Sequence, residues 1–216
     1  MAAADHLGHQ TIFSDESSCQ NNTSNPSQWV FRLPSQKWNR QFVNLQNHVK
    51  ANISIMVWGA IWQGGRSNLI VMDRDYKPPQ RGGYSSWSYQ KALQEGLIPI
   101  YNGTRHFQQD NARIHVSQSS MDWLLNNTIE LLPDWPPYSP DLNPIEHVWS
   151  LMKRQLGKDY PDIMDLKKNQ LDIAEFTSCL QEVWHRVDQD KIDKLLASIP
   201  RRLEAVKKAR GWYTKY

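Results

Sequence analysis

The sequence predicts a mixed α/β fold with one substantial core and a helical extension at its C-terminal end. Short β-type runs separated by turn residues fill the first third of the chain, strand-then-helix patterns follow, and helical periodicity continues from about residue 144. A length of 216 residues suits a single domain of this kind. We place the core at residues 1–160 and the extension, packed on that core, at residues 161–216.

The first third of the chain is predicted to form a meander, most simply antiparallel. The first strand should end at the polar run Ser14–Ser18, which could turn the chain and would place Asp15 at the end of that strand. We expect strands at Gln10–Phe13, Trp29–Leu33, Ile53–Trp62 and Asn68–Met72.

The middle of the chain alternates helices and strands. We expect helices at Ser85–Gly96 and His115–Leu125 and strands at His106–Asp110 and Thr128–Leu132. Asp110 would then lie at the C-terminal edge of a strand, where α/β folds commonly place their sites.

A proline-stiffened loop precedes the helical part of the chain. Pro136, Pro137, Pro140 and Pro144 restrict φ, so the loop should present the first turn of the next helix in a defined direction. We expect helices at Pro144–Leu156, Leu171–Val187 and Lys191–Ala209, with a kink or restart at Ser198–Pro200.

Composition indicates a folded protein that stays inside the cell. Hydrophobic content is 39%, the chain has ten tryptophans, and its mean hydropathy is −0.68. The longest nearly apolar run, Ile53–Trp62, is too short to cross a membrane, and the N-terminus has no apolar core of a signal peptide. Cys19 and Cys179 are far apart and lack metal-ligand spacing, so neither a disulfide framework nor a zinc site is indicated.

Basic residues are concentrated at the C-terminal end. Residues 200–216 contain six basic side chains and one acidic one, a local charge of +5 in a chain of net charge +3. This distribution fits a polyanionic partner, and from charge alone a solvated helix end fits about as well.

Three carboxylates stand out by their contexts. Asp15 and Asp110 each follow a short strand, and Glu146 opens a helix, so the three could converge at one edge of the sheet. Clustered carboxylates repel one another unless a divalent cation holds them, and oxygen-only ligands suit Mg²⁺ or Mn²⁺. A pair of such ions can hydrolyse a phosphodiester without a Ser, Cys or His nucleophile.

Each carboxylate also has a structural alternative. Asp15 and Asp110 could form ordinary turns, in which aspartate bonds to nearby backbone amides. Asn143, Pro144 and Glu146 match a capping box, and spacing alone favours that interpretation of Glu146. Trp149 shares the helical face of Glu146, where core packing is favoured over a role in the site. His106, His115 and His147 are more simply structural hydrogen-bonding residues than metal ligands.

Five motifs, in order, resemble the catalytic domain of Tc1/mariner-type transposases and together span nearly the whole chain. The most specific is FQQDNA, with His115 after it, followed by the proline loop and its helix. The motifs are FSDES (Phe13–Ser17), MVWGAI (Met56–Ile61), FQQDNA (Phe107–Ala112), WPPYSPDLNPIEHVWSLMK (Trp135–Lys153) and SIPRRLEAV (Ser198–Val206).

The resemblance implies a ribonuclease H-like fold with a mixed sheet of about five strands flanked by helices. It also implies an Asp-Asp-Glu triad of Asp15, Asp110 and Glu146 that binds two Mg²⁺ ions, for which Mn²⁺ can substitute. Asp110 and Glu146 are separated by thirty-five residues, close to the spacing in Tc1-like members, and the triad interpretation of Glu146 therefore replaces the capping box.

The implied reaction is transposition. Water cleaves a phosphodiester at the end of the element, and the freed 3′-hydroxyl joins target DNA, at TA steps in this family. By sequence proximity, Arg113, His115 and Lys153 are the expected contacts to DNA phosphates. Further expectations from the resemblance are a nuclear location, a homodimer and no membrane partner.

The chain departs from the family pattern at its N-terminal end. The run before Asp15 is shorter and less apolar than the usual first strand, and Cys19 occupies a position where an aromatic residue is common. Fourteen residues before Asp15 cannot hold the helix-turn-helix domains that read the ends of an element, so we expect sequence-specific end binding to be absent. The alternative function is a truncated or co-opted remnant that binds DNA or another partner without catalysis.

Overall fold

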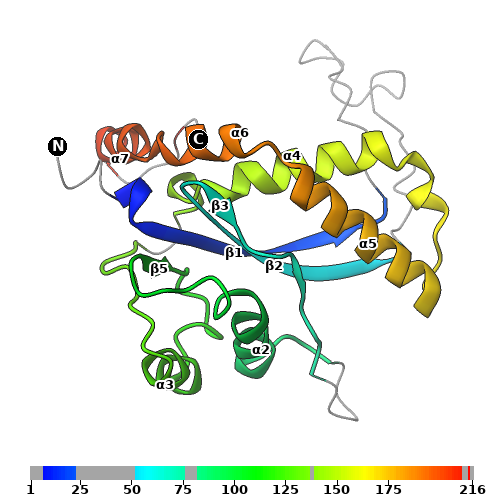
Figure 1. Cartoon of the computed structure of the whole chain (residues 1–216), viewed down its shortest axis with the longest axis horizontal. Helices are drawn as coiled ribbons and strands as arrows, with labels where there is room; N and C mark the ends of the chain where they lie inside the picture. The colour runs from blue at the N-terminus through cyan, green and yellow to red at the C-terminus, as the bar shows by residue number, and fades with distance from the viewer. Residues whose placement is uncertain (1–6, 23–51, 76–81, 137–138, 211–213, 215–216) are drawn as a thin grey trace, which may run out of the picture.

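A mixed five-stranded sheet forms the centre of the molecule (Figure 1). The computed structural model describes residues 7–22, 52–75, 82–136, 139–210 and 214. The sheet order is β3-β2-β1-β5, with β4 also paired to β2; β1 is antiparallel to β2 and parallel to β5. The strands are β1 (Thr11–Gln20), β2 (Ser54–Trp62), β3 (Gly65–Arg66), β4 (Ile70–Val71) and β5 (His106–Gln108).

The mixed α/β class and the antiparallel pairing at the start of the chain are confirmed. The predicted strand at Trp29–Leu33 lies outside the described residues. The predicted strand at Thr128–Leu132 is reduced to a single parallel bridge between Leu131 and Phe107.

Strand β1 corrects our prediction for the first strand. We expected it to end at Phe13, but it continues to Gln20, so Asp15 lies in mid-strand rather than at a strand end. The polar run resembles a turn because serine and aspartate favour turns. In the structure β1 pairs with β2 from Phe13 to Gln20, and this long-range pairing overrides the local preference.

Helices cover both faces of the sheet (Figure 1). One face carries α2 (Ser86–Gly96) and α3 (Gln118–Asn126), and the other carries α4 (Ile145–Asp159), α5 (Gln170–Arg186), α6 (Gln189–Leu196) and α7 (Ile199–Lys208). Two short 3-10 turns, η3 (Pro140–Leu142) and η4 (Pro161–Asp165), flank α4. Helix α3 begins three residues later than expected, and the predicted last helix is divided into α6 and α7 at the expected restart.

Alternation along the strands creates two hydrophobic cores. Phe13 and Val57 face α4–α7, whereas Ile12 and Trp58 face α2 and α3. The larger cluster includes side chains of the last three helices together with the sheet, which explains why these helices pack on it.

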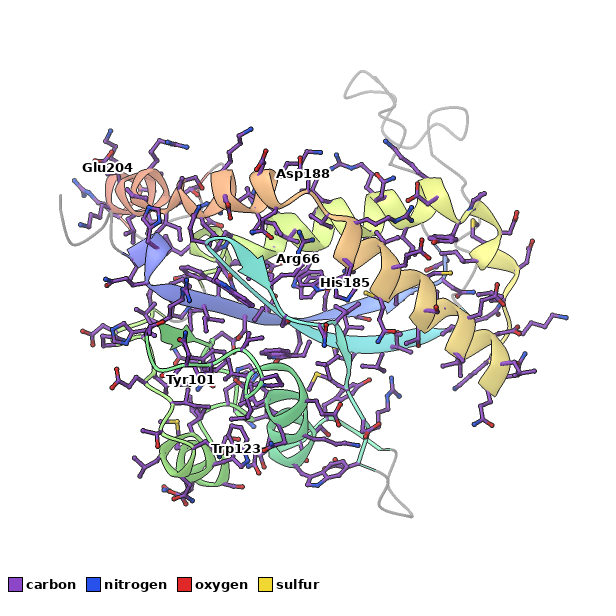
Figure 2. The ribbon with its side chains drawn as sticks, viewed as in Figure 1. Arg66, Tyr101, Trp123, His185, Asp188 and Glu204 are labelled. Atoms are coloured by element: carbon purple, nitrogen blue, oxygen red, sulfur yellow. The ribbon has the colours of Figure 1, made fainter. Side chains whose placement is uncertain are left out.

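The junction of α5 and α6 is tied to the sheet by Arg66. Its guanidinium donates to the carbonyl of Trp184 at 2.7 Å and to Oε1 of Gln189 at 3.1 Å. Figure 2 shows Arg66 on β3 beneath this junction, close to Asp188. Burial lowers the pKa of Arg66, and the charges of Asp188 and Asp193 partly offset that shift.

The predicted boundary near residue 160 falls between α4 and η4, and the division into core and extension stays a prediction. Within the described parts of the chain, no helix has the length and apolar character needed to cross a membrane.

Candidate active site

A single cavity of about 350 Å³ brings the three predicted carboxylates together. Asp15 enters it from the middle of β1, Asp110 from the loop after β5, and Glu146 from the first turn of α4. The cavity wall also contains side chains of the proline loop, among them Trp135 and Pro136. Residues that are 131 positions apart in sequence, Asp15 and Glu146, thus share one site.

Asp15 is the most buried member of the set. Its Oδ2 accepts a hydrogen bond from the indole Nε1 of Trp149 at 3.2 Å, and its β2 partner is Gly59. Burial and the charges of Glu16 and Glu146 raise the pKa of Asp15 to about 8, although the Trp149 bond lowers it. Trp149 is therefore a core residue, 2% exposed, as favoured from the sequence, and it supports the site through its bond to Asp15 without lining the cavity.

Asp110 is held by His115 and by its own turn. Its Oδ1 accepts from the backbone amide of Ala112 at 2.9 Å, the turn bond anticipated as an alternative, and lies 2.6 Å from His115 Nδ1. The other ring nitrogen, Nε2, lies 3.2 Å from Oε1 of Glu16. The His115 bond lowers the pKa of Asp110; burial lowers the pKa of His115, but its bonds to Asp110 and Glu16 outweigh this and raise it to about 10.

Glu146 is exposed at the start of α4 and has no capping role. Pro144 occupies the N-cap position, one residue later than expected, and α4 has no side-chain capping bond there. Asn143 instead accepts from the amide of Ile145 at 3.3 Å and donates to the carbonyl of Ser14 at 3.0 Å. Asn143 therefore fixes the start of the Glu146 helix directly against β1.

Ser14 is a supporting residue that the sequence did not single out. Its hydroxyl donates to the carbonyl of Gln108 at 2.8 Å, its amide donates to Oε1 of Gln108 at 3.2 Å, and its carbonyl accepts from Asn143. These bonds join β1, β5 and the start of α4 next to Asp15. Its position within the FSDES motif was the only sequence signal for this role, because its partners Gln108 and Asn143 are about a hundred residues away in the chain.

The expected DNA contacts are placed in different environments. Arg113 is exposed and lines the cavity, and Lys153 is exposed on α4. Burial raises the pKa of Glu146, and the charge of Lys153 partly offsets that shift. His115 is only 2% exposed and both its ring nitrogens face carboxylates. Its placement fits holding Asp110 rather than touching a DNA phosphate.

The donor set fits a divalent cation. Asp15, Asp110 and Glu146 supply only carboxylate oxygens, and the raised pKa of Asp15 reflects repulsion and burial that a cation would relieve. Among the described residues, no group of three or more His, Cys, Asp or Glu side chains is close enough to hold one ion. Mg²⁺ commonly takes only one or two protein carboxylates and completes its shell with water and phosphate oxygens.

Comparison with known sequences identifies the family. The profile of the family described as DDE superfamily endonuclease matches residues 10–167. The chain is 33% identical over 210 residues to the transposase of the transposable element Tc1 from Caenorhabditis elegans, covering 95% of this chain and 70% of that one. It is 30% identical over 223 residues to the Tcb2 transposase of Caenorhabditis briggsae, covering 98% and 73%.

Solved structures agree on the fold. The chain matches the Mos1 transposase catalytic domain solved with raltegravir and Mg with a TM-score of 0.58 and 20% identity, covering 96% of this chain and 87% of that one. The Mos1 mariner paired end complex with Mn matches with a TM-score of 0.64 and 19% identity, covering 96% and 57%. The fold is thus ribonuclease H-like, and the chain belongs to the DDE superfamily endonucleases, as a Tc1/mariner-type catalytic domain.

Proposed function

We propose that the cavity is the active site of a metal-dependent DNA nuclease and strand transferase that acts in transposition. The observation that carries this proposal is the convergence of Asp15, Asp110 and Glu146 on one cavity, with the half-buried Asp15 carboxyl close to the like charges of Glu16 and Glu146. The relatives are transposases by name, which supports the same reaction class.

In this proposal the three carboxylates hold two Mg²⁺ or Mn²⁺ ions. Bound in the site, the ions would supply Lewis-acid stabilisation of both the attacking and the leaving oxygen of a phosphodiester. Trp149 and His115 would keep the carboxylates of Asp15 and Asp110 directed at the cavity, and the proline loop with Trp135 would limit its water content.

Two successive displacements follow from one such site. In the first, water forms a bond to phosphorus and the bond to the 3′-oxygen breaks, which leaves a 3′-hydroxyl and a 5′-phosphate. In the second, that 3′-hydroxyl attacks a target phosphodiester, and one phosphodiester bond forms as another breaks. Neither step needs an oxidant or a covalent enzyme intermediate.

DNA is the proposed partner, and the nucleus is the proposed location because the substrate is chromosomal DNA. Arg113 at the rim of the cavity and Lys153 on α4 are the proposed phosphate contacts. A homodimer that joins two DNA ends remains part of the proposal.

The proposal is tested by nicking of supercoiled plasmid with Mn²⁺ or Mg²⁺. Wild-type protein should nick the plasmid, and Asp110→Asn and Glu146→Gln, which keep side-chain size but remove charge, should abolish the activity. Asp165→Asn, an exposed carboxylate of η4, is the matched control and should retain it.

The same preparation distinguishes the non-catalytic alternative. Wild-type protein that binds DNA in a salt-dependent manner but nicks none with either metal would support a binding protein and defeat the catalytic proposal. Nicking that survives Asp110→Asn would place the activity elsewhere.

A further inference from the structure

We propose that Arg202 and Thr214 form a clamp that positions the first turn of α4, and with it Glu146, from the C-terminal end of the chain. This C-terminal clamp rests on the proposed function of Glu146 as a metal ligand. It assigns a role to the SIPRRLEAV motif, which lies outside the active-site cavity.

Arg202 is a buried cation that contacts three groups close to the first turn of α4. It is 1% exposed, on α7. Its Nε donates to the hydroxyl of Ser198 at 2.9 Å and its Nη1 to the carbonyl of Asp141 at 2.8 Å. Its Nη2 lies 3.3 Å from Nδ1 of His147, which must accept because a guanidinium can only donate.

Thr214 binds the side chain of Asp141, the same residue whose carbonyl accepts from Arg202. Its amide and its hydroxyl donate to Oδ2 of Asp141 at 2.7 Å and 2.6 Å. Asp141 thus has its carbonyl held by Arg202 and its carboxylate held by Thr214. Asp141 belongs to η3, the last turn of the proline loop before α4.

The two held positions bracket Glu146. Asp141 lies five residues before it and His147 directly follows it, so the clamp fixes the chain on both sides of the carboxylate. The pocket side is already fixed by Asn143, which bonds to the carbonyl of Ser14. The clamp supplies the opposing contact, so the direction of the Glu146 side chain depends on α7. Arg202 is therefore a positioning residue: its hydrogen bonds to described residues go to Ser198, Asp141 and His147, and none of these is a member of the Asp15, Asp110 and Glu146 triad.

The test compares Arg202→Ala with Arg201→Ala, an exposed neighbour on the same helix that removes the same charge. In metal-free protein, hydrogen exchange at the amides of Leu142, Asn143, Ile145 and His147 should quicken about tenfold in Arg202→Ala, while β1 amides keep their protection. The Mn²⁺ concentration for half-maximal nicking should rise about tenfold, with little change in KM for DNA. Arg201→Ala should leave both unchanged.

Two further variants distinguish loss of the clamp from general unfolding of the protein. Arg202→Lys keeps the charge but cannot reach all three acceptors. It should therefore leave β1 protection intact, slow the exchange of the local amides relative to Arg202→Ala, and retain part of the raised Mn²⁺ requirement. Thr214→Ala should shift the exchange of the same amides by a smaller factor.

The inference is overturned if Arg202→Ala leaves the local amides and the Mn²⁺ requirement unchanged, or if exchange quickens equally in β1. Wild-type protein that nicks no DNA would defeat the proposed function instead. The exchange measurement, which needs no metal or DNA, would then still decide whether the clamp holds the start of α4.

Discussion

At the scale of single residues, the site depends on how two aspartates are held. Asp15 is half-buried beside Trp149, and this burial together with the charges of Glu16 and Glu146 disfavours its charged form. Asp110 is more exposed, and its bond to His115 favours the charged form. The metal would therefore meet one carboxylate that is ready to bind and one that must first lose a proton.

The raised pKa of Asp15 predicts how stability depends on pH. Because its folded-state pKa is about 8 and its ordinary value is 3.8, its contribution is full below about pH 4 and is lost as pH rises through 8. We expect the Tm of metal-free protein to fall between pH 5 and 9 (about four pH units) more than that of Asp15→Asn, which cannot titrate. Calorimetry checks this, and equal slopes for the two proteins would contradict it.

Metal binding should reverse that trend. Mn²⁺ competes with the Asp15 proton, so its addition should raise the Tm more at about pH 8.5 than at about pH 5.5. Thermal scans with and without Mn²⁺ measure the difference, and Asp15→Asn should show a smaller increase at either pH.

His115 should matter for activity although it is buried and lies outside the cavity lining. His115→Gln removes the bridge between Asp110 and Glu16, and loss of such a supporting partner typically lowers metal affinity or activity about 10–100-fold. Nicking assays over a range of Mn²⁺ concentrations test this against His185→Gln, an exposed histidine on α5. Equal activity of His115→Gln and His185→Gln would contradict this prediction and would indicate that His115 has only a structural role.

At the scale of elements, the pairing of β1 with β2 decides which residue lies next to Asp15 and how much space Trp149 has there. Gly59 of the MVWGAI motif pairs with Asp15, and a Cβ at that position would lie 2.8 Å from Trp149 and 3.1 Å from Trp184. The two indoles stack with centroids 4.9 Å apart. The glycine thus makes room for the tryptophan that donates to Asp15.

Gly59→Ala should therefore lower both stability and activity. Overpacking at a closed site costs about 1–3 kcal/mol, and the displaced Trp149 would leave Asp15 with a weaker hydrogen bond. Gly83→Ala is the matched control, because a Cβ there meets nothing within 4 Å. Chemical denaturation and nicking assays compare the two, and a Gly59→Ala variant as stable as wild type would show that the indoles can shift freely.

At the scale of the whole molecule, the helices after residue 160 complete the core instead of merely covering it. Phe176, Leu180, Val183 and Trp184 of α5 are fully buried in the same cluster as Phe13 of β1. Removing α5–α7 would leave α4 as the only one of the four helices α4–α7 on that face of the sheet, and it would release the C-terminal clamp on α4.

A chain of residues 1–165 should accordingly fail to fold cooperatively, because it loses the buried apolar side chains that α5–α7 contribute to that face. We expect a broad unfolding transition by circular dichroism and strong binding of a hydrophobic dye, compared with the full chain. A sharp transition in the shortened chain would instead make residues 1–160 an independent domain.

The sequence by itself determined the family, the mixed α/β class and the three carboxylates, since these depend on local motifs and on their spacing along the chain. The helix that carries Glu146 was also predictable, because prolines and apolar periodicity act within a few residues. Only the tertiary structure decided that Asp15 lies in mid-strand, that His115 is buried between two carboxylates, and that Arg202 reaches Asp141 and His147. Each of these depends on partners far apart in sequence, and strand pairing and burial at that range override what serine, histidine or arginine prefer locally.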